Sequence, residues 1–369
     1  MKTQAAGRIE KARTRVVRAG ELATRHRESF LRHATAEKLV NLANVFRDRY
    51  RVRPEVRSYP FEIVLDITNR CNLRCPLCVT GQHRNERPYG AMAFGDFRRV
   101  IDELAPTLFK ARLHSWGEPL LHPDLLGMIE YLTRRNVGSE ISTNLLLLRK
   151  EEPLRLVDSG LEMLVVSMDG TTQEVYEAYR KGGRLDTVME NVRALAEAKR
   201  TRGSRFPVIE VQFLLMKHNL HQVRDIQRFS RELGADRCRT FPVALNVQDE
   251  LQRRAWLPDD ARYCRYDPDT WEDRYYALNR VCHWLWQSAV INWDGTVSPC
   301  CIYEGSKTEM GGNVFRDGFR SVWNGPQYRI ARKTFARRHR DRTGPEGPPI
   351  CAVCRGRPRA LTPGQQGIY

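Results

Sequence analysis

The sequence lacks both a membrane-spanning segment and a targeting signal. No apolar run approaches the roughly 20 residues that are needed to cross a bilayer. The first residues, Met-Lys-Thr-Gln-Ala-Ala-Gly-Arg, lack the apolar core of a secretory signal peptide. Acidic residues also interrupt the basic N-terminal stretch, unlike in the acid-poor peptides that direct proteins to organelles; they are Glu10, Glu21, Glu28 and Glu37. These absences predict a cytoplasmic protein without a membrane partner.

Cysteine, in contrast, is plentiful, because the 369 residues include ten cysteines. Thiols remain reduced in the cytoplasm, so this number points to metal ligation rather than to disulfides. Hydrophobic residues make up 41% of the chain, which is enough for a sizeable core. The length suits one large domain and a smaller one.

The formal net charge is +17, and two explanations stay open at this level. One is an anionic ligand, such as nucleic acid, a phosphorylated sugar or a nucleotide-linked substrate. The other is a general use of arginine on a solvated surface. No module or aromatic stacking motif typical of sequence-specific RNA recognition is present, so nucleic acid is not expected as a partner.

Residues 58–245 alternate short β-rich runs with helical stretches, which predicts parallel strands joined by right-handed crossovers. The predicted strands are Phe61–Ile67, Lys110–His114, Ser139–Ser142, Met163–Ser167, Val208–Leu215 and Arg239–Val243. The predicted helices are Asp96–Leu104, Leu125–Arg134, Glu151–Ser159, Gln173–Tyr179, Thr187–Lys199 and Gln222–Leu233. Six such units favour an open, partial (β/α)6 TIM-like barrel over a closed barrel of eight units.

The predicted fold class is therefore α/β, and we divide the chain into three parts. Residues 1–57 form a basic helical N-terminal extension, with one or two amphipathic helices packed on the main body. Residues 58–245 form the partial barrel. Residues 246–369, where the alternation stops, form a small, loop-rich, cysteine-rich module.

Three cysteines, Cys71, Cys75 and Cys78, follow the first predicted strand within one short stretch of irregular chain. A [4Fe–4S] cluster normally takes four cysteines, so three would leave one iron without a protein ligand. An open coordination position is what a catalytic metal requires. A structural zinc site or a chance cluster is the alternative.

The spacing Cys-x3-Cys-x2-Cys after the first barrel strand resembles that of the radical S-adenosylmethionine (SAM) enzymes. This resemblance implies that SAM binds the open iron and is cleaved reductively to a 5′-deoxyadenosyl radical, which abstracts hydrogen from a substrate. The cofactor carries the difficult chemistry, and the protein supplies binding and orientation. The resemblance also implies an external electron donor such as flavodoxin or ferredoxin.

Polar motifs end the next predicted strands, at the rim where barrel enzymes keep their chemistry. Gly117-Glu118-Pro119 resembles the family segment that contacts the SAM amino group, although Trp116 replaces its first glycine. By the same resemblance the SAM-binding residues are Gly117, Glu118, Pro119, Ser142, Thr143, Asn144, Ser167, Asp169 and Arg180. A plain turn at Ser167–Gly170 and an exposed Arg180 are the alternatives. No catalytic residue is assigned, and His114, His122 and His218 are given no role.

A second set of cysteines lies in the C-terminal module: Cys282, Cys300, Cys351 and Cys354. Four thiolates suit a [4Fe–4S] cluster, and zinc suits the same ligands. Cys282 and Cys300 can bracket a hairpin that turns at Trp293-Asp294-Gly295. The pattern resembles the SPASM and twitch extensions of radical SAM enzymes, which implies one auxiliary [4Fe–4S] cluster. The remaining cysteines are Cys238, Cys264 and Cys301, each a hydrogen-atom donor or a small buried hydrophobic residue.

The resemblance implies dehydrogenation or epimerisation of a small polar molecule, neutral or anionic, of the sugar, aminocyclitol or nucleoside type. The first alternative is a SPASM-type enzyme that matures a ribosomally made peptide. RNA modification, suggested by charge alone, is the second alternative, and a non-catalytic iron–sulfur scaffold is the last.

Overall fold

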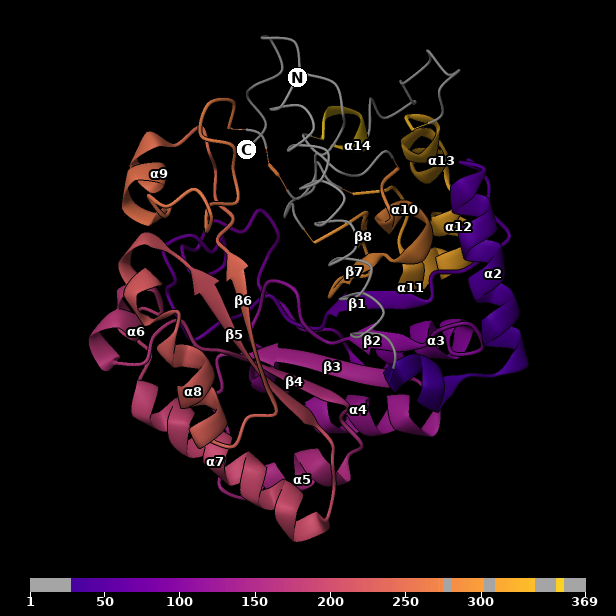
Figure 1. The fold of residues 1–369 in the computed structure, drawn as a ribbon. Coiled ribbons are helices and arrows are strands. Elements are labelled where there is room, and N and C mark those ends of the chain that lie inside the picture. Colours follow the sequence, from indigo (N-terminus) through magenta and orange to yellow (C-terminus); the bar gives the residue numbers. More distant parts are fainter. Residues whose placement is uncertain (1–27, 272, 275–280, 302–308, 336–349, 355–369) are drawn as a thin grey trace, which may run out of the picture.

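A computed structural model describes residues 28–271, 273–274, 281–301, 309–335 and 350–354 (Figure 1). One sheet of eight strands runs through it in the order β6-β5-β4-β3-β2-β1-β7-β8. Neighbours from β1 to β6 are parallel and follow chain order. The strands are β1 Glu62–Asp66, β2 Lys110–Arg112, β3 Gly138–Thr143, β4 Met163–Ser167, β5 Val208–Leu215, β6 Arg237–Pro242, β7 Val290–Asn292 and β8 Val297–Ser298.

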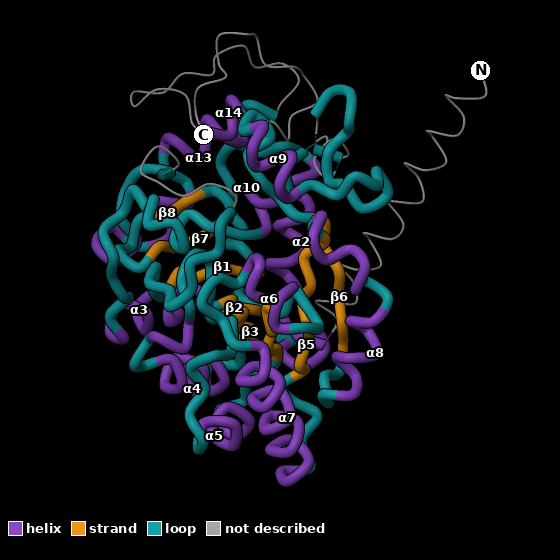
Figure 2. Tube along the Cα trace, turned by 90° about the vertical axis from the view of Figure 1, so that its left-hand side faces the viewer, coloured by secondary structure: helices purple, strands orange, loops and turns teal. Residues whose placement is uncertain are grey.

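Helices between the strands cover the outside of the sheet. They are α3 Phe94–Leu104, α4 Leu125–Arg134, α5 Glu152–Asp158, α6 Gln173–Tyr179, α7 Leu185–Arg202 and α8 Asp225–Glu232, with two 3₁₀ turns, η1 Pro119–Leu121 and η2 Lys217–Gln222. Figures 1 and 2 show α4, α5, α7 and α8 around the strands in both views. Helix α3 buries Phe97, Val100, Ile101 and Leu104, whose spacing of three and four residues places them on one face.

The predicted α/β architecture, an open barrel of six parallel strands, is confirmed. The bounds of β4, β5, α4 and α6 are those predicted, and the other elements differ by one to three residues at their ends. Strand β1 is buried at all five positions, as expected for a parallel strand covered on both faces.

The C-terminal hairpin continues the barrel sheet, which the sequence did not reveal. Strand β7 is parallel to β1, and β8 is antiparallel to β7. The turn between them contains Gly295, with φ of 84°. Without β7, the outer edge of β1 would leave backbone groups unpaired in the interior, and such groups are costly. The hairpin satisfies them, for example through Val64 N–H and the Ala289 carbonyl at 2.9 Å.

The other helices gather at the β1–β7 side of the sheet and beyond β6. They are α2 Ala36–Tyr50, α9 Glu250–Trp256, α10 Trp284–Gln287, α11 Val314–Asp317, α12 Phe319–Trp323, α13 Pro326–Lys333 and α14 Ile350–Val353 (Figure 1). Residues 28–33 are also helical, and the basic stretch predicted before them lies outside the described residues. No helix among the described residues is long and apolar enough to cross a membrane.

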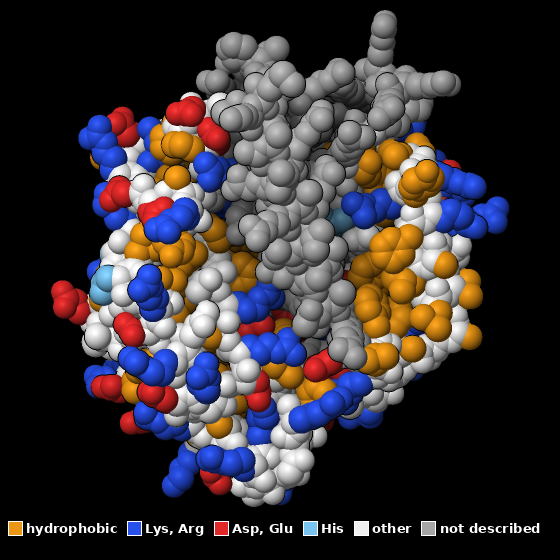
Figure 3. Space-filling view, in the orientation of Figure 1, with side chains coloured by type: hydrophobic (Ala, Val, Ile, Leu, Met, Phe, Trp, Pro, Cys, Tyr) orange, Lys and Arg blue, Asp and Glu red, His pale blue; other side chains and the backbone are white. Residues whose placement is uncertain are grey.

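Charge is dispersed over the face that Figure 3 shows, where basic and acidic side chains are interspersed across the lower part. Several exposed arginines belong to surface ion pairs, such as Arg202 with Asp158 and Arg228 with Asp225. On this face the arrangement differs from the continuous basic stripe of a nucleic-acid-binding surface.

Candidate functional site

The loop after β1 brings Cys71, Cys75 and Cys78 together at the carboxyl ends of the strands. Cys78 N–H donates to the Cys75 carbonyl at 3.1 Å, and Leu73 N–H donates to Cys71 Sγ at 3.5 Å. The Cys71 thiol is within electrostatic range of the other two thiols, and none of the three is in a disulfide. All three pack in an apolar cluster whose buried members are Leu73, Cys75, Tyr179, Met216, Val243, Val247, Leu257 and Tyr266.

This thiol loop fits an iron–sulfur cluster better than a single zinc ion. Burial raises the pKa of the Cys71 thiol to about 11, so a metal must displace its proton. Within the described part of the chain, no three His, Cys, Asp or Glu side chains are placed to share one metal ion. Cysteines of a [4Fe–4S] cluster each bind a different iron, so they need not converge on one point. Three thiols on one loop, with Cys75 buried and Cys71 and Cys78 half-buried, supply the ligand type and number for three irons.

The loop is held closely against its neighbours. A Cβ atom added to Gly117 would lie 1.9 Å from the Thr68 carbonyl oxygen, and one added to Gly81 would lie 2.6 Å from the Cys75 nitrogen. Glu118 N–H also donates to the Arg70 carbonyl at 2.7 Å, just before Cys71. The two glycines therefore allow backbone-to-backbone packing that any side chain would prevent.

Glu118 connects the end of β2 to the end of β3. Its buried carboxylate accepts hydrogen bonds from Thr143 Oγ1 at 2.6 Å, Asn144 N at 2.8 Å and Leu120 N at 3.0 Å. Burial raises the pKa of Glu118, and these hydrogen bonds oppose the increase. Asn144 Nδ2 in turn donates to Asn72 Oδ1 at 2.8 Å, within the thiol loop. The predicted residues Gly117, Glu118, Thr143 and Asn144 thus form one connected network beside the cysteines.

Arg180, which ends α6, lies beside the thiols. Its Nε donates to Asp169 Oδ2 at 2.6 Å, and its Nη1 is 3.8 Å from Cys75 Sγ. Asp169 is fully buried and also accepts from Leu214 N at 2.7 Å. Burial lowers the pKa of Arg180, but Asp169 and Cys75 outweigh it and raise the pKa well above its usual value. The sequence predicted that Arg180 binds SAM or is exposed to solvent. In the structure its guanidinium forms an ion pair with Asp169.

Ser142 and Ser167 also lie at this rim, in the neighbouring strands β3 and β4. Both are half-buried, and Pro119 is buried in the adjoining 3₁₀ turn. The structure therefore places every predicted SAM-binding residue at the carboxyl ends of β2, β3 and β4 or on the segments that follow them. Their contact with SAM stays a prediction.

The second cysteine set is also brought together, from segments far apart in sequence. Cys282 precedes α10, Cys300 follows β8, and Cys351 lies in α14. Cys282 is within electrostatic range of Cys354, and Tyr328 is within range of Cys351 and Cys300. Burial raises the pKa of Cys282 to about 11, while N–H groups of Trp284 and Leu285 hydrogen-bond to it. These four thiols match the donor set of one [4Fe–4S] cluster.

Several residues that the sequence reading missed lie beside the thiols. Tyr176 and Tyr328 are each buried with a hydroxyl that has no hydrogen-bond partner among the described residues. Asn72, in the Glu118 network, is a further missed residue, and it could have been suspected because it lies between two motif cysteines. Of the remaining cysteines, Cys264 packs in the apolar cluster of the thiol loop. Cys238 is half-buried in β6 and Cys301 is exposed.

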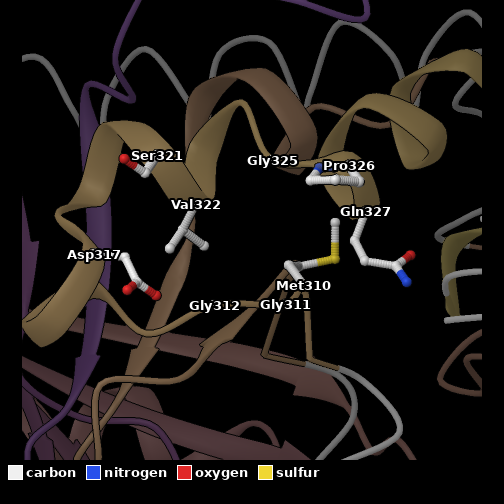
Figure 4. A pocket seen from close by; sticks show the side chains of 9 residues that line it. All are labelled: Met310, Gly311, Gly312, Asp317, Ser321, Val322, Gly325, Pro326 and Gln327. Atoms are coloured by element: carbon white, nitrogen blue, oxygen red, sulfur yellow. The ribbon is translucent and has the colours of Figure 1, made fainter. Parts of the chain in front are cut away.

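A separate pocket of about 240 Å³ lies between α12 and α13 (Figure 4). Met310, Asp317, Val322 and Gln327 are among its lining residues. It contains none of the predicted site residues, and its volume is below the range of about 300–1,000 Å³ usual for ligand sites. We assign no function to it.

Comparison with known proteins agrees with this geometry. The profile of the radical SAM superfamily matches residues 65–229, and that of the SPASM iron–sulfur cluster-binding domain matches residues 282–355. The chain is a radical SAM enzyme with a C-terminal SPASM domain. Such an enzyme uses SAM and [4Fe–4S] clusters, as both cysteine sets predicted.

Three curated relatives are 24–28% identical to this radical SAM enzyme. A tungsten-containing aldehyde ferredoxin oxidoreductase cofactor-modifying protein of Pyrococcus furiosus matches 72% of this chain and 81% of its own, at 28% identity. The subtilosin biosynthesis protein AlbA of Bacillus subtilis matches at 24% identity over 72% of this chain and 60% of its own. The PqqA peptide cyclase of Bradyrhizobium diazoefficiens matches at 28% identity over 58% of this chain and 55% of its own.

Among solved structures, SuiB of Streptococcus suis bound to S-adenosylmethionine has a TM-score of 0.58, at 17% identity. The match covers 83% of this chain and 71% of SuiB. At that identity the likeness shows the fold alone, and it confirms the radical SAM architecture.

Proposed function

We propose that this radical SAM enzyme modifies a peptide. In this proposal Cys71, Cys75 and Cys78 hold the SAM-cleaving cluster, and Cys282, Cys300, Cys351 and Cys354 hold one auxiliary cluster. The observation that carries the proposal is the gathering of three buried or half-buried thiols beside the Glu118 network and Arg180, at the rim of an open barrel. When bound, the cluster and SAM supply a one-electron reductive cleavage that yields a carbon radical.

The residues of this chain would hold, orient and shield those groups. Cys71, Cys75 and Cys78 supply three thiolates, and the Arg180 guanidinium offsets negative charge next to Cys75. Asp169 fixes that guanidinium by accepting from its Nε. The buried apolar residues around the loop, such as Leu73 and Met216, exclude water from a reaction in which a radical must be protected.

The residues assigned to SAM are Gly117, Glu118, Pro119, Ser142, Thr143, Asn144, Ser167, Asp169 and Arg180. Within this set Glu118 and Asp169 act as positioning residues, because their oxygens already accept two or more hydrogen bonds from the protein. The guanidinium of Arg180 and the half-buried hydroxyls of Ser142 and Ser167 are the groups left to face the cofactor.

The names of the relatives support a peptide substrate over the small polar molecule predicted from sequence. AlbA is named for bacteriocin biosynthesis, and PqqA cyclase for a peptide. The structure adds an open strand edge: β6 ends the sheet, all six of its residues are half-buried, and its outer edge has no strand partner among the described residues. An extended peptide can pair with such an edge.

A small substrate is the second candidate, since the Pyrococcus relative, of which this chain covers 81%, is named for cofactor modification. For this candidate the proposed reaction is dehydrogenation or epimerisation of a sugar, aminocyclitol or nucleoside. Both candidates require an external electron donor of the flavodoxin or ferredoxin type.

The test uses anaerobically reconstituted protein with SAM and dithionite. Iron analysis should give about eight irons per chain if both cysteine sets hold cubic clusters. Peptides encoded beside the gene are then incubated with the enzyme and analysed by mass spectrometry. A SAM-dependent change in peptide mass supports the proposal. Formation of 5′-deoxyadenosine with a small metabolite and with no encoded peptide would favour the second candidate.

A further inference from the structure

Helix α2 has an inverted distribution of polar and apolar residues. Its buried positions are Lys38, Asn41, Val45 and Asp48, three of which are polar or charged. Its exposed apolar residues are Leu39 at 52%, Val40 at 63%, Phe46 at 49% and Tyr50 at 90% exposure. A helix on a protein surface normally turns its apolar stripe to the core. Here the stripe faces away.

The buried polar face fixes α2 to the barrel. Asn41 exchanges two hydrogen bonds of 2.9 Å with the backbone of Tyr59, and Asp48 accepts from Ser58 Oγ at 3.0 Å. Lys38 Nζ donates to the Asn136 carbonyl. The orientation of the helix is therefore set by specific polar contacts, so the outward apolar stripe is a built feature of the surface.

The exposed stripe follows the helical repeat. Leu39, Ala43, Phe46 and Tyr50 are spaced by four, three and four residues, which places them on one face. Figure 3 shows hydrophobic side chains gathered over α2 on the right of the molecule. Exposed apolar patches of this kind mark sites of macromolecular association.

Arginines flank the C-terminal half of the stripe. Arg47 and Arg51 are exposed, and Asp48, which lies between them, is buried. From Leu39 to Arg51 the exposed surface of α2 thus carries positive charge and no carboxylate. An acidic protein is the complementary partner.

The same helix lies directly against a proposed ligand of the auxiliary cluster. Arg49 Nη2 donates to the Val281 carbonyl at 3.2 Å, one residue before Cys282, and helix α2 contacts α10. The Arg49 guanidinium is within electrostatic range of the Cys282 thiol. The exposed stripe and this contact with the Cys282 segment therefore belong to the same helix.

We propose that the outward face of α2, defined by Leu39, Phe46, Arg47, Tyr50 and Arg51, is the docking surface for a small acidic one-electron carrier protein that exchanges electrons with the auxiliary cluster. The step is a transfer of one electron from the reduced carrier to the oxidised cluster. The carrier is oxidised by one electron, the cluster is reduced by one, and no bond or proton changes. The inference rests on the cluster at Cys282 and not on the identity of the substrate.

The test compares two double variants with the same change of charge. The docking variant is Arg47→Glu/Tyr50→Asp. The control is Arg193→Glu/Leu154→Asp, in which exposed residues of α7 and α5 change at the other end of the molecule. An acidic flavodoxin is the probe, and its affinity for the reconstituted holoprotein is measured by biolayer interferometry. We expect about a 10-fold weaker affinity for the docking variant, no change for the control, and weaker wild-type binding at high salt.

A second readout separates docking from electron transfer. Stopped-flow reduction of the auxiliary cluster is followed in the background Cys71→Ala/Cys75→Ala/Cys78→Ala, which removes the other cluster. The docking variant should slow reduction by flavodoxin hydroquinone about 10-fold and leave reduction by dithionite unchanged.

Three results would overturn the inference. One is equal flavodoxin affinity for wild type and docking variant. Another is a wild-type dimer, seen by light scattering, that the docking variant dissociates, which would make the stripe a subunit interface. The third is loss of precursor-peptide binding in the docking variant, which would make it a substrate surface. Formation of 5′-deoxyadenosine with dithionite should persist in the docking variant, so failure of docking and failure of the proposed function are distinguishable.

Discussion

The two cysteine sites of this protein have the same ligand chemistry but are assembled differently. At the barrel rim, three thiols lie within eight residues of one loop, Cys71 to Cys78. In the SPASM domain, four thiols come from Cys282, the end of a hairpin, and a helix more than fifty residues later. The first site is a local motif on a strand end. The second exists only after the C-terminal segments have folded onto α10 and α13.

The neighbours of the thiols differ as well. The rim site has a half-buried guanidinium, Arg180, and a buried carboxylate network around Glu118. The SPASM site has backbone N–H groups at Cys282 and a hydroxyl at Tyr328, together with the guanidiniums of Arg49 near Cys282 and of the buried Arg332 near Tyr328. Both sites thus hold cationic groups. The rim site adds the hydrogen-bonded carboxylate of Glu118, which suits a site that must bind a charged cofactor.

The largest expected effect separates the two sites by function. Cys75→Ala should abolish SAM cleavage, since one iron loses its ligand, and it should leave about four irons per chain in the SPASM domain. Cys282→Ala should also leave about four irons, now at the rim, and should retain 5′-deoxyadenosine formation while product is lost. Iron analysis measures the number of irons per chain in each variant, and chromatography of the nucleoside products measures the 5′-deoxyadenosine that each variant forms. If Cys75→Ala still forms 5′-deoxyadenosine, the assignment of the rim site is wrong.

A substitution at the rim should affect folding, because the loop there packs backbone against backbone. Gly117→Ala places a Cβ atom 1.9 Å from the Thr68 oxygen and should destabilise the protein by about 3 kcal/mol. Gly95→Ala is the matched control, since a Cβ atom there meets nothing within 4 Å, and it should be neutral or stabilising by about 0.5 kcal/mol. Urea unfolding measures the stability of both variants. Equal unfolding midpoints for Gly117→Ala and Gly95→Ala would contradict the tight packing of this loop.

A third substitution tests whether a buried charge far from the thiols stabilises the fold without affecting either cluster. Glu162 precedes β4, at the opposite end of the barrel, and bonds to His33 Nε2 at 2.7 Å and Ser29 Oγ at 2.8 Å. Burial raises the pKa of Glu162, but the His33 contact and the Ser29 hydrogen bond outweigh it, so the pKa falls below 4.5. Glu162→Gln should cost about 2 kcal/mol at neutral pH, with both clusters intact.

The pH dependence of that change has a definite sign. Because the folded pKa of Glu162 is lowered, its contribution is present above pH 4.5 and is lost as pH falls through the folded value. The stability difference between wild type and Glu162→Gln should therefore shrink below pH 4.5. Glu197→Gln, at an exposed ion pair with Arg200, is the control and should change stability by less than about 0.5 kcal/mol. If the stability difference between wild type and Glu162→Gln does not change with pH, the ionised Glu162 carboxylate is not the group that stabilises the fold.

The smallest effect concerns the two buried tyrosines. Tyr328→Phe removes a buried hydroxyl that has no partner among the described residues, so the metal-free protein should gain about 1 kcal/mol. In the loaded protein the hydroxyl can donate to a cluster sulfur, and hydrogen bonds to sulfur raise cluster potentials. Redox titration monitored by electron paramagnetic resonance should then show a more negative auxiliary potential for Tyr328→Phe. Tyr176→Phe, at the rim, should leave that potential unchanged.

Much of the barrel could be predicted from sequence because its signals are local. The buried run before Cys71 and the helical spacing of residues such as Phe97 and Ile101 reflect strand and helix periods directly. The positions of Glu118, Thr143 and Asn144 at strand ends also follow from alternation, since parallel strands bring their carboxyl ends to one edge. That Glu118 bonds to Thr143 and Asn144, and that Asp169 holds Arg180, required the structure.

The substrate was the least predictable feature. A small polar molecule was expected from the resemblance to enzymes with an auxiliary cluster, but such a cluster can accept an electron from a substrate radical of any size. The open edge of β6 and the names of relatives favour a peptide, and neither is visible in residue spacing.

By itself the sequence determined the chemistry: seven cysteines in two spaced sets, a six-unit alternation, and polar motifs at strand ends. Only the tertiary structure decided that the SPASM hairpin joins the barrel sheet through β7 and β1, that Tyr328 lies near Cys300 and Cys351, and that α2 carries an outward apolar stripe. The reason is that ligand type and local period are properties of neighbouring residues. Which distant surfaces meet depends on the burial and hydrogen bonding of the whole chain, and these are satisfied only in three dimensions.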